Sequence, residues 1–222
     1  MRSILTVLLA FAAGVLLATW WPGPPAMPSR VGHPAPVPAS MDPDATPDSE
    51  AAVESWPSQA PTPEQVLYAQ PRMMRDALAR LGPRVPGKPN LYLLAFAGDG
   101  GEDVFRNEAE YAARLFAQRF GASAHSLVLE NNPATLATHP LASWSNLEAA
   151  LEGLGKTMQP DQDILLLYLT SHGDEEHNLL LDMDPLPLYQ IGATDLADIL
   201  AMHPFKWKVV VVNACYSGGF VP

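Results

Sequence analysis

The stretch KVVVVNACYSGG, residues 208–219, places four consecutive valines before an asparagine and Cys215. An apolar run of this length, followed by glycines, is typical of a buried and central β-strand. Cys215 is the only cysteine among the 222 residues, which excludes an internal disulfide and a cysteine-based structural zinc site. The thiol is therefore either an inert core group or a chemical group delivered by the strand.

Three further apolar runs precede this one, at residues 90–97, 125–130 and 163–170. None alternates between polar and apolar residues, as a half-exposed strand would. Between the runs, apolar residues recur at helical spacing over 105–120 and, after Ser143 as N-cap, over 144–158. Thr194 is expected to cap a shorter helix. This order predicts an α/β fold, with a parallel sheet covered by helices on both faces.

The first 21 residues predict a signal anchor. Arg2 precedes an uncharged apolar run from Ile4 to Trp21, long enough to cross a bilayer core of about 30 Å as a helix. The alternative is a cleaved signal peptide, but no Ala-x-Ala-like site follows the run. The charge at Arg2 places the rest of the chain outside the cytoplasm, on the periplasmic side in a bacterium, or secreted if the segment is cleaved.

Three parts follow the anchor. Residues 22–61 are rich in Pro, Ala, Ser and Asp, and we expect a disordered linker. Thr62 and Gln65 have the pattern of a capping box, which begins a helical lead-in over residues 62–89. Pro71 is expected to break that helix. The domain that contains the sheet then covers residues 90–222.

Composition and motifs argue against several kinds of partner. The chain has 24 acidic and 13 basic residues without a Lys/Arg cluster, so we expect no binding to nucleic acid. GDGG at 98–101 lacks the P-loop lysine and the dinucleotide glycine spacing, and is better explained as a tight turn. Residues 174–177 could be metal ligands, but an acidic stretch after a strand is usually a solvated loop. We expect neither a metal nor a cofactor.

Two residues with catalytic chemistry follow apolar runs directly. His172 comes after the third run and Cys215 after the fourth, and the carboxyl ends of parallel strands form the ligand-binding edge of an open sheet. An imidazole there can favour the thiolate or protonate a leaving amine. The main-chain amides of Gly173 and Cys215 could form an oxyanion hole. This set predicts acyl transfer through a thioester.

The same segments resemble those of a known family. LLLYLTSHG and, about forty residues later, VVVVNACYSGG are similar to the histidine and cysteine motifs of the legumain-like cysteine peptidases, in the caspase-like clan. FAGDGGEDVFRNEAE resembles the family segment whose arginine binds Asn or Asp in the specificity pocket, and that arginine falls on Arg106. The resemblance covers about residues 90–220. It implies a three-layer caspase-like fold with a mostly parallel sheet, and an endopeptidase that acts on peptides or proteins.

In that family, Cys215 would be the nucleophile and His172 the general acid/base. The chain departs from the pattern at Val104, where animal legumains have an Asn that supports the histidine, so the third catalytic group is missing or lies elsewhere. Tyr216 replaces a common Glu, which leaves the preference for Asn or Asp open. Caspase-like folds normally continue with two further strands, so we expect this sequence to be a fragment or a truncated product, with the C-terminal strands missing.

Alternative roles remain open for single residues and for the whole chain. Arg106 could equally pair with a neighbouring acid: Glu102, Asp103 or Glu110. An α/β-hydrolase with a cysteine nucleophile would need glycine at Ser217 and a histidine after the nucleophile, so it fits poorly. A membrane-tethered, non-catalytic binding module on a caspase-like scaffold is the other alternative. Labelling of Cys215 that depends on His172 would distinguish an enzyme from such a module.

Overall fold

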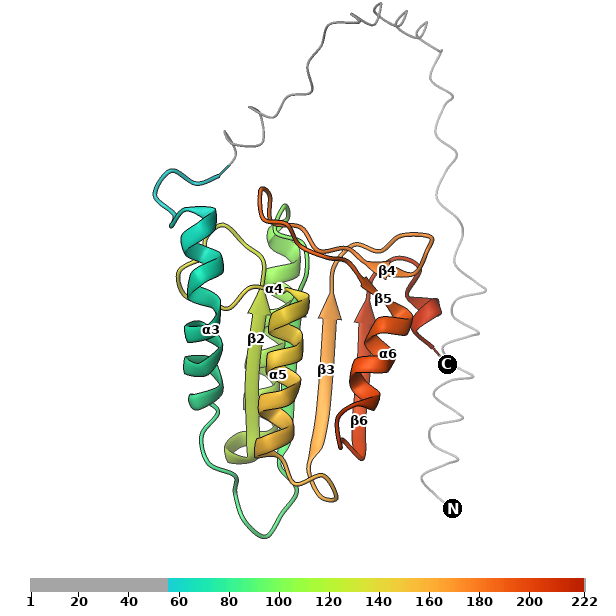
Figure 1. The fold of residues 1–222 in the computed structure, drawn as a ribbon. Helices are drawn as coiled ribbons and strands as arrows, with labels where there is room; N and C mark the ends of the chain where they lie inside the picture. Colours follow the sequence, from blue (N-terminus) through green and yellow to red (C-terminus); the bar gives the residue numbers. More distant parts are fainter. Residues whose placement is uncertain (1–55, 222) are drawn as a thin grey trace, which may run out of the picture. The chain divides into compact units, whose positions relative to one another are not determined.

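The four apolar runs form the central sheet in a computed structural model, which describes residues 56–221 (Figure 1). The strands are β1 (Leu91–Ala97), β2 (Ala124–Glu130), β3 (Ile164–Thr170) and β6 (Trp207–Asn213). All neighbours are parallel, in the order β2-β1-β3-β6. A short antiparallel pair, β4 (Asn178–Leu179) and β5 (Ile191–Gly192), lies between β3 and β6 in the chain. The predicted parallel α/β sheet is confirmed.

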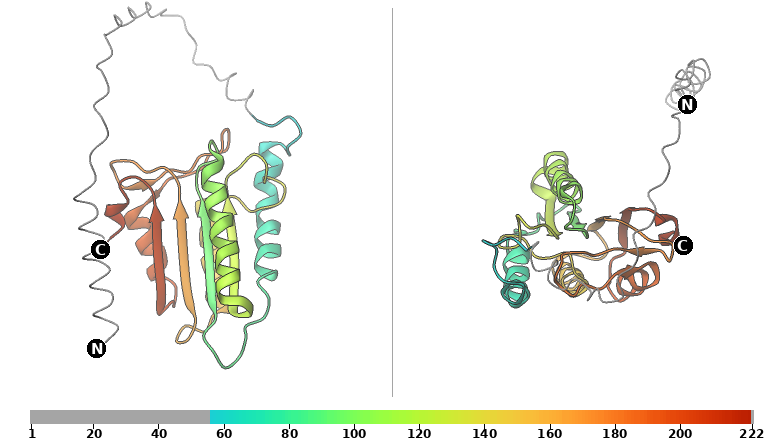
Figure 2. Two further views of the ribbon diagram at one scale, coloured as in Figure 1. Left: turned by 180° about the vertical axis from the view of Figure 1, so that it is seen from behind. Right: turned by 90° about the horizontal axis from the view of Figure 1, so that it is seen from above.

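Helices cover both faces of this sheet. Helix α4 (Asp103–Phe120) lies on one face, and α3 (Pro63–Ala79), α5 (Trp144–Thr157) and α6 (Ala193–Ala201) lie on the other (Figure 2). Strand β1 sends Leu94 and Phe96 into the larger core under α3, α5 and α6, and Leu93 and Ala95 into the core under α4. Because both faces are buried, the strand shows no polar alternation. The three layers agree with the caspase-like fold that the resemblance implies.

Helix α3 begins as predicted but does not break. The Thr62 hydroxyl accepts from the Gln65 amide at 3.3 Å, and the Gln65 side chain accepts from the Thr62 amide at 2.9 Å. The helix then continues through Pro71, so the predicted break is wrong. Proline removes one backbone hydrogen bond, whereas Val66 and Met74 on either side are buried. Packing of the apolar face outweighs the low helix propensity of one exposed proline.

One of the two other predicted caps is correct. The Ser143 hydroxyl accepts from the Asn146 amide at 3.3 Å and begins α5. Thr194 is not a cap, because α6 starts at Ala193 and Thr194 lies in its first turn. The extended residue before the helix is Gly192 at the end of β5, so the chain enters α6 directly from a strand and no side chain caps the helix.

Strand β6 is an edge strand in the part of the chain that the structure describes, and the predicted burial of its valines is wrong there. Val209, Val210 and Val211 are 50%, 39% and 40% exposed. Open apolar grooves lie on both sides of the strand, one toward α6 and one toward α4. The valine run predicts the apolar character of both faces of the strand, but it does not specify what covers them.

The N-terminal predictions fall mostly beyond the described residues. The predicted anchor at 1–21 lies outside them, as does the linker at 22–61 up to residue 55. From residue 56 the chain is described, and Trp56 and Ala60 pack against a small core cluster that contains Val66 and Leu141. None of the helices within residues 56–221 is both long and apolar enough to cross a bilayer.

A buried ion pair lies at the amino ends of the strands. Asp163 is 1% exposed, and its carboxylate accepts from Arg84 Nε and Nη2 at 2.8 and 2.9 Å. The amides of Asn90 and Gln159 donate to the same carboxylate at 2.9 and 2.8 Å. Burial alone would raise the pKa of Asp163, but the hydrogen bonds, led by those from Arg84, outweigh burial and lower it.

Replacing Arg84 with methionine should lower the melting temperature by about 5–10 °C, because the buried carboxylate loses its cation. The lowered pKa of Asp163 means that its contribution to stability is present at neutral pH and is lost as the pH falls through the folded-state value. The difference in melting temperature between Arg84→Met and wild type should therefore become smaller as the pH is lowered from 7 to about 3. Thermal unfolding at both pH values measures it.

The matched control is Arg72→Met. Arg72 forms an exposed pair with Asp76 at 3.7 Å on the surface of α3, and its loss should change the melting temperature little. Equal effects of the two substitutions at neutral pH, or a gap that stays constant on acidification, would contradict the role given to the Asp163 pair.

Candidate active site

His172 and Cys215 follow neighbouring parallel strands at the carboxyl edge of the sheet. Thr170 and Asn213 are the last register partners of β3 and β6, and each candidate residue comes two positions later. The Ser171 amide donates to the Asn213 carbonyl at 3.3 Å, which extends the contact beyond the strands. Neighbouring strands lie about 4.8 Å apart, so the sheet places His172 and Cys215 on adjacent loops at the same edge.

The His172 ring is held by residues at the start of α4. Its Nε2 lies 3.1 Å from Glu102 Oε1, and its ring contacts Phe105 edge to face, with 5.0 Å between the centroids. Both members of the His172–Glu102 pair are about half-exposed, at 49% and 59%. Among the described residues, His172 Nδ1 has no hydrogen-bond partner and no bond joins the ring to Cys215. The ring is thus oriented through one nitrogen while the other remains available.

Sequence reasoning missed this use of Glu102, which it considered only as a partner for Arg106. Val104, two residues farther along, is the position that corresponds to the supporting asparagine of animal legumains. A usable signal existed, since Glu102 follows β1 and β1 neighbours β3 in the sheet. The carboxyl ends of neighbouring parallel strands meet at one edge.

Gly173 lies against the main chain of Cys215. A Cβ on Gly173 would overlap the Cys215 carbonyl oxygen and would lie 3.3 Å from the Ala214 side chain. Within residues 56–221, the main-chain amides of Gly173 and Cys215 donate to no protein acceptor. The two amides predicted for an oxyanion hole therefore sit on adjoining loops with their hydrogen-bonding capacity unused.

A second set of contacts joins the same two loops. His177 Nδ1 lies 3.0 Å from the Tyr216 carbonyl oxygen, and the Tyr216 hydroxyl donates to Glu175 at 3.1 Å. Gly219 packs so closely on the His177 ring that a side chain there would overlap it. His177 and Tyr216 both have left-handed backbone, with φ of 61° and 54°. The loop after β3 thus holds the loop after β6 by hydrogen bonds and close packing.

Arg106 bonds to neither His172 nor Cys215 but to Asn132 and Asp103. Its Nη1 donates to Asn132 Oδ1 at 2.9 Å, and its Nη2 lies 3.3 Å from Asp103. Asn132 in turn donates to Asp103 at 2.9 Å. The pairing with Asp103, one of the alternatives raised above, is therefore present. The Arg106 side chain is 19% exposed, and its pocket role stays a prediction.

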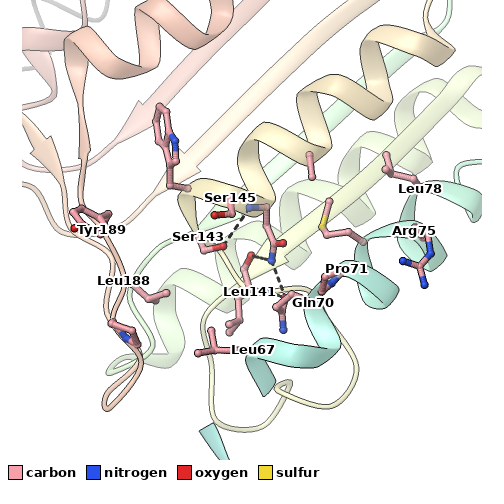
Figure 3. Close-up of a pocket in the computed structure, with 15 residues that line it drawn as sticks. Leu67, Gln70, Pro71, Arg75, Leu78, Leu141, Ser143, Ser145, Leu188 and Tyr189 are labelled. Carbon is pink, nitrogen blue, oxygen red and sulfur yellow. Dashed lines mark hydrogen bonds between the residues drawn. The ribbon is translucent and has the colours of Figure 1, made fainter. Parts of the chain in front are cut away.

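A separate apolar cavity of about 620 Å³ lies between α3, the start of α5 and residues 187–189 (Figure 3). Leu67 and Arg75 line it from α3, and Tyr189 from the opposite side. The hydrogen bond from Asn146 to Gln70, at 2.7 Å, joins the two helices beside it. Neither Cys215 nor His172 contributes to its lining, so this cavity is not the cleft of the candidate site.

Comparison with known proteins finds a match over the C-terminal third of the chain, which contains both candidate residues. Residues 144–222 match the family model described as the Peptidase C13 family, the legumain family. The chain matches no curated protein and no solved structure. The matched segment begins at α5 and includes β3, His172, β6 and Cys215. Over this segment the chain is therefore similar to the legumain-like cysteine peptidases of the Peptidase C13 family.

Proposed function

We propose that this chain is a cysteine-type endopeptidase in which Cys215 is the nucleophile and His172 the general acid/base. One observation carries the proposal: the two residues each lie two positions beyond a register pair of neighbouring parallel strands, within a segment that matches a cysteine peptidase family. In the first step, His172 removes the thiol proton and the sulfur attacks the scissile carbonyl carbon. The amides of Gly173 and Cys215 stabilise the resulting oxyanion.

The intermediate then collapses to a thioester. The carbon–nitrogen bond breaks, and His172 returns its proton to the leaving amine. Water attacks the thioester with His172 as base, which releases the acid product and restores the thiol. Glu102 acts in both steps by holding His172 Nε2 at 3.1 Å, so that Nδ1 is the nitrogen that exchanges the proton with sulfur. Glu102 thereby takes the supporting role for which Val104 has no suitable group.

The substrate preference belongs to the same proposal. The segment around Arg106 supports a preference for Asn or Asp before the scissile bond. The Arg106 side chain is 19% exposed, and Asn132 and Asp103 orient its guanidinium. An amide or carboxylate of a substrate would accept from the guanidinium. Residues 1–21 support placement of the peptidase at a membrane and outside the cytoplasm.

Alkylation of Cys215 tests the proposed pair without requiring a substrate. At pH 7, iodoacetamide should modify wild type about tenfold faster than His172→Ala, because the thiolate is the reacting species and the imidazole favours it. Cys215 is the only cysteine, so the mass of the intact chain reports a single site. Glu102→Ala should slow the reaction less, because it disturbs the orientation of the ring and leaves the imidazole in place.

His203→Ala is the matched control, because His203 packs on Phe205 just before the amino end of β6. It should react at the wild-type rate. Equal rates for wild type and His172→Ala, with both proteins folded, would rule out the pair and leave a non-catalytic domain.

A further inference from the structure

Glu108 of α4 bonds to both strands that lead into the candidate site. Its Oε2 accepts from Thr170 Oγ1 at 2.5 Å and from Tyr168 Oη at 3.3 Å, both on β3. The same oxygen accepts from Asn213 Nδ2 on β6 at 2.9 Å. A weaker bond from Asn213 to Thr170, at 3.4 Å, closes the set. One carboxylate oxygen thus joins a helix to two adjacent strands.

These bonds lie at the last point of regular structure before the catalytic residues. Thr170 and Asn213 are register partners, and they precede His172 and Cys215 by two residues. The backbone ladder already pairs β3 with β6 along seven residues, from Ile164↔Trp207 onward, so the strands do not need Glu108 to find their register. Asn213 is exposed, so its bond to Glu108 gains little from burial.

The contribution of Glu108 is instead a fixed distance between α4 and β6. The same helix positions His172, through Glu102 and Phe105, whereas β6 positions Cys215. Within the described part of the chain, Glu108 is the one side chain of α4 that hydrogen-bonds to β6. Helix α4 therefore positions the imidazole of His172, and strand β6 positions the thiol of Cys215. The Glu108 carboxylate connects this helix to this strand.

We infer that Glu108 is a positioning residue, which holds the His172 ring and the Cys215 sulfur in reacting geometry by tying α4 to the ends of β3 and β6. The inference rests on the proposed function of that pair. Within the described residues β6 has a neighbouring strand on one side only, so a side-chain hydrogen bond at its last residue limits its movement more than it would in a central strand. Loss of the tie should affect the rate of reaction rather than the binding of a peptide.

Three substitutions of Glu108 separate position from charge. Glu108→Gln keeps an acceptor oxygen at the same distance from the backbone and should retain activity within about threefold. Glu108→Asp keeps the charge but withdraws the oxygen by one methylene, and Glu108→Ala removes it. Both should lower kcat by about 10–100-fold with KM changed by less than about twofold, as expected when a catalytic group is displaced by about 1 Å. Both should also slow iodoacetamide alkylation of Cys215 toward the His172→Ala rate.

Glu110→Ala is the matched control on the same helix. Glu110 pairs with Arg114 at 3.2 Å on the exposed side of α4 and bonds to neither strand. Its alkylation rate, kcat and KM should equal those of wild type. The experiment uses the full chain, with thermal unfolding of each variant as the check on folding.

The outcomes distinguish this inference from the function on which it rests. Alkylation that does not depend on His172 overturns the proposed function, and the inference falls with it. Alkylation that depends on His172 but is unchanged in Glu108→Ala and Glu108→Asp overturns the inference alone. An active Glu108→Asp beside an inactive Glu108→Gln would show that charge rather than position matters, and it also overturns the inference. Should Glu108→Ala fail to fold, the Gln and Asp variants decide.

Discussion

Replacing Cys215 with alanine should lower kcat for peptide hydrolysis by about 10⁴–10⁶-fold, the size of effect seen when a covalent nucleophile is removed. The reason is that no other group in the described chain can form the thioester at this edge of the sheet. Because the Gly173 and Cys215 amides belong to the main chain, the variant keeps the proposed oxyanion donors, and a small residual rate over water is expected. The side chain of Cys215 is exposed, so the melting temperature should not change.

The measurement is cleavage of a peptide library under single-turnover conditions, followed by mass spectrometry. Wild type should also show a transient mass increase equal to the acyl fragment, and Cys215→Ala should show none. Ser217→Ala, two residues along the same loop, is the control and should keep activity within about twofold. Cleavage by Cys215→Ala at a rate close to wild type would refute the nucleophile assignment.

The second large effect is expected from Gly173→Ala. A methyl group there would overlap the carbonyl oxygen of Cys215 and lie 3.3 Å from Ala214, and a main-chain atom cannot rotate away as a side chain can. The loop after β3 or the loop after β6 must therefore move. Since displacement by about 1 Å can cost about 100-fold in rate, kcat/KM should fall by at least that factor. The change would also displace the amides of Gly173 and Cys215, the two proposed oxyanion donors.

Kinetics, alkylation of Cys215 and thermal unfolding together identify the cause. Gly155→Ala is the matched control, because its new Cβ in α5 would meet only ordinary contacts, the nearest being His203 at 3.7 Å. Alanine also has the higher helix propensity, so the control should be as stable as wild type or slightly more stable. A fully active Gly173→Ala would show that the two loops are farther apart in solution than their packing here indicates.

Strong periodicities predicted the layers of the fold. Strands β1 and β3 contain unbroken apolar runs because helices cover both of their faces, and the helices between them show one apolar side each. Single residues were less informative. Pro71 lies on the exposed side of a helix whose buried side decides the outcome, and Thr194 follows a strand that already sets the start of α6. At both positions, tertiary structure rather than the local propensity of the residue determines where the helix begins or continues.

Some residues of the candidate site can be predicted from the sequence, and others cannot. The positions of His172 and Cys215 follow from the rule that parallel strands end at a common edge, and this can be derived from the sequence. The roles of Glu102 and Glu108 cannot, because they depend on how α4 is rotated over β3 and β6. The sequence alone does not show which acidic residues of a helix face the sheet and which face solvent. Only the helix orientation shows that Glu108 faces the strands while Glu110 pairs with Arg114.

The exposed valines of β6 have a practical consequence for any enzymology. An uncovered strand edge with apolar side chains offers free backbone donors and acceptors to a second copy, and such edges promote intermolecular β-pairing. Val209, Val210 and Val211 form such a segment within the described chain. Because Cys215 lies just beyond it, aggregation through this edge would bury the thiol and mimic inactivity. Rates are therefore meaningful only at dilutions where light scattering shows a single species.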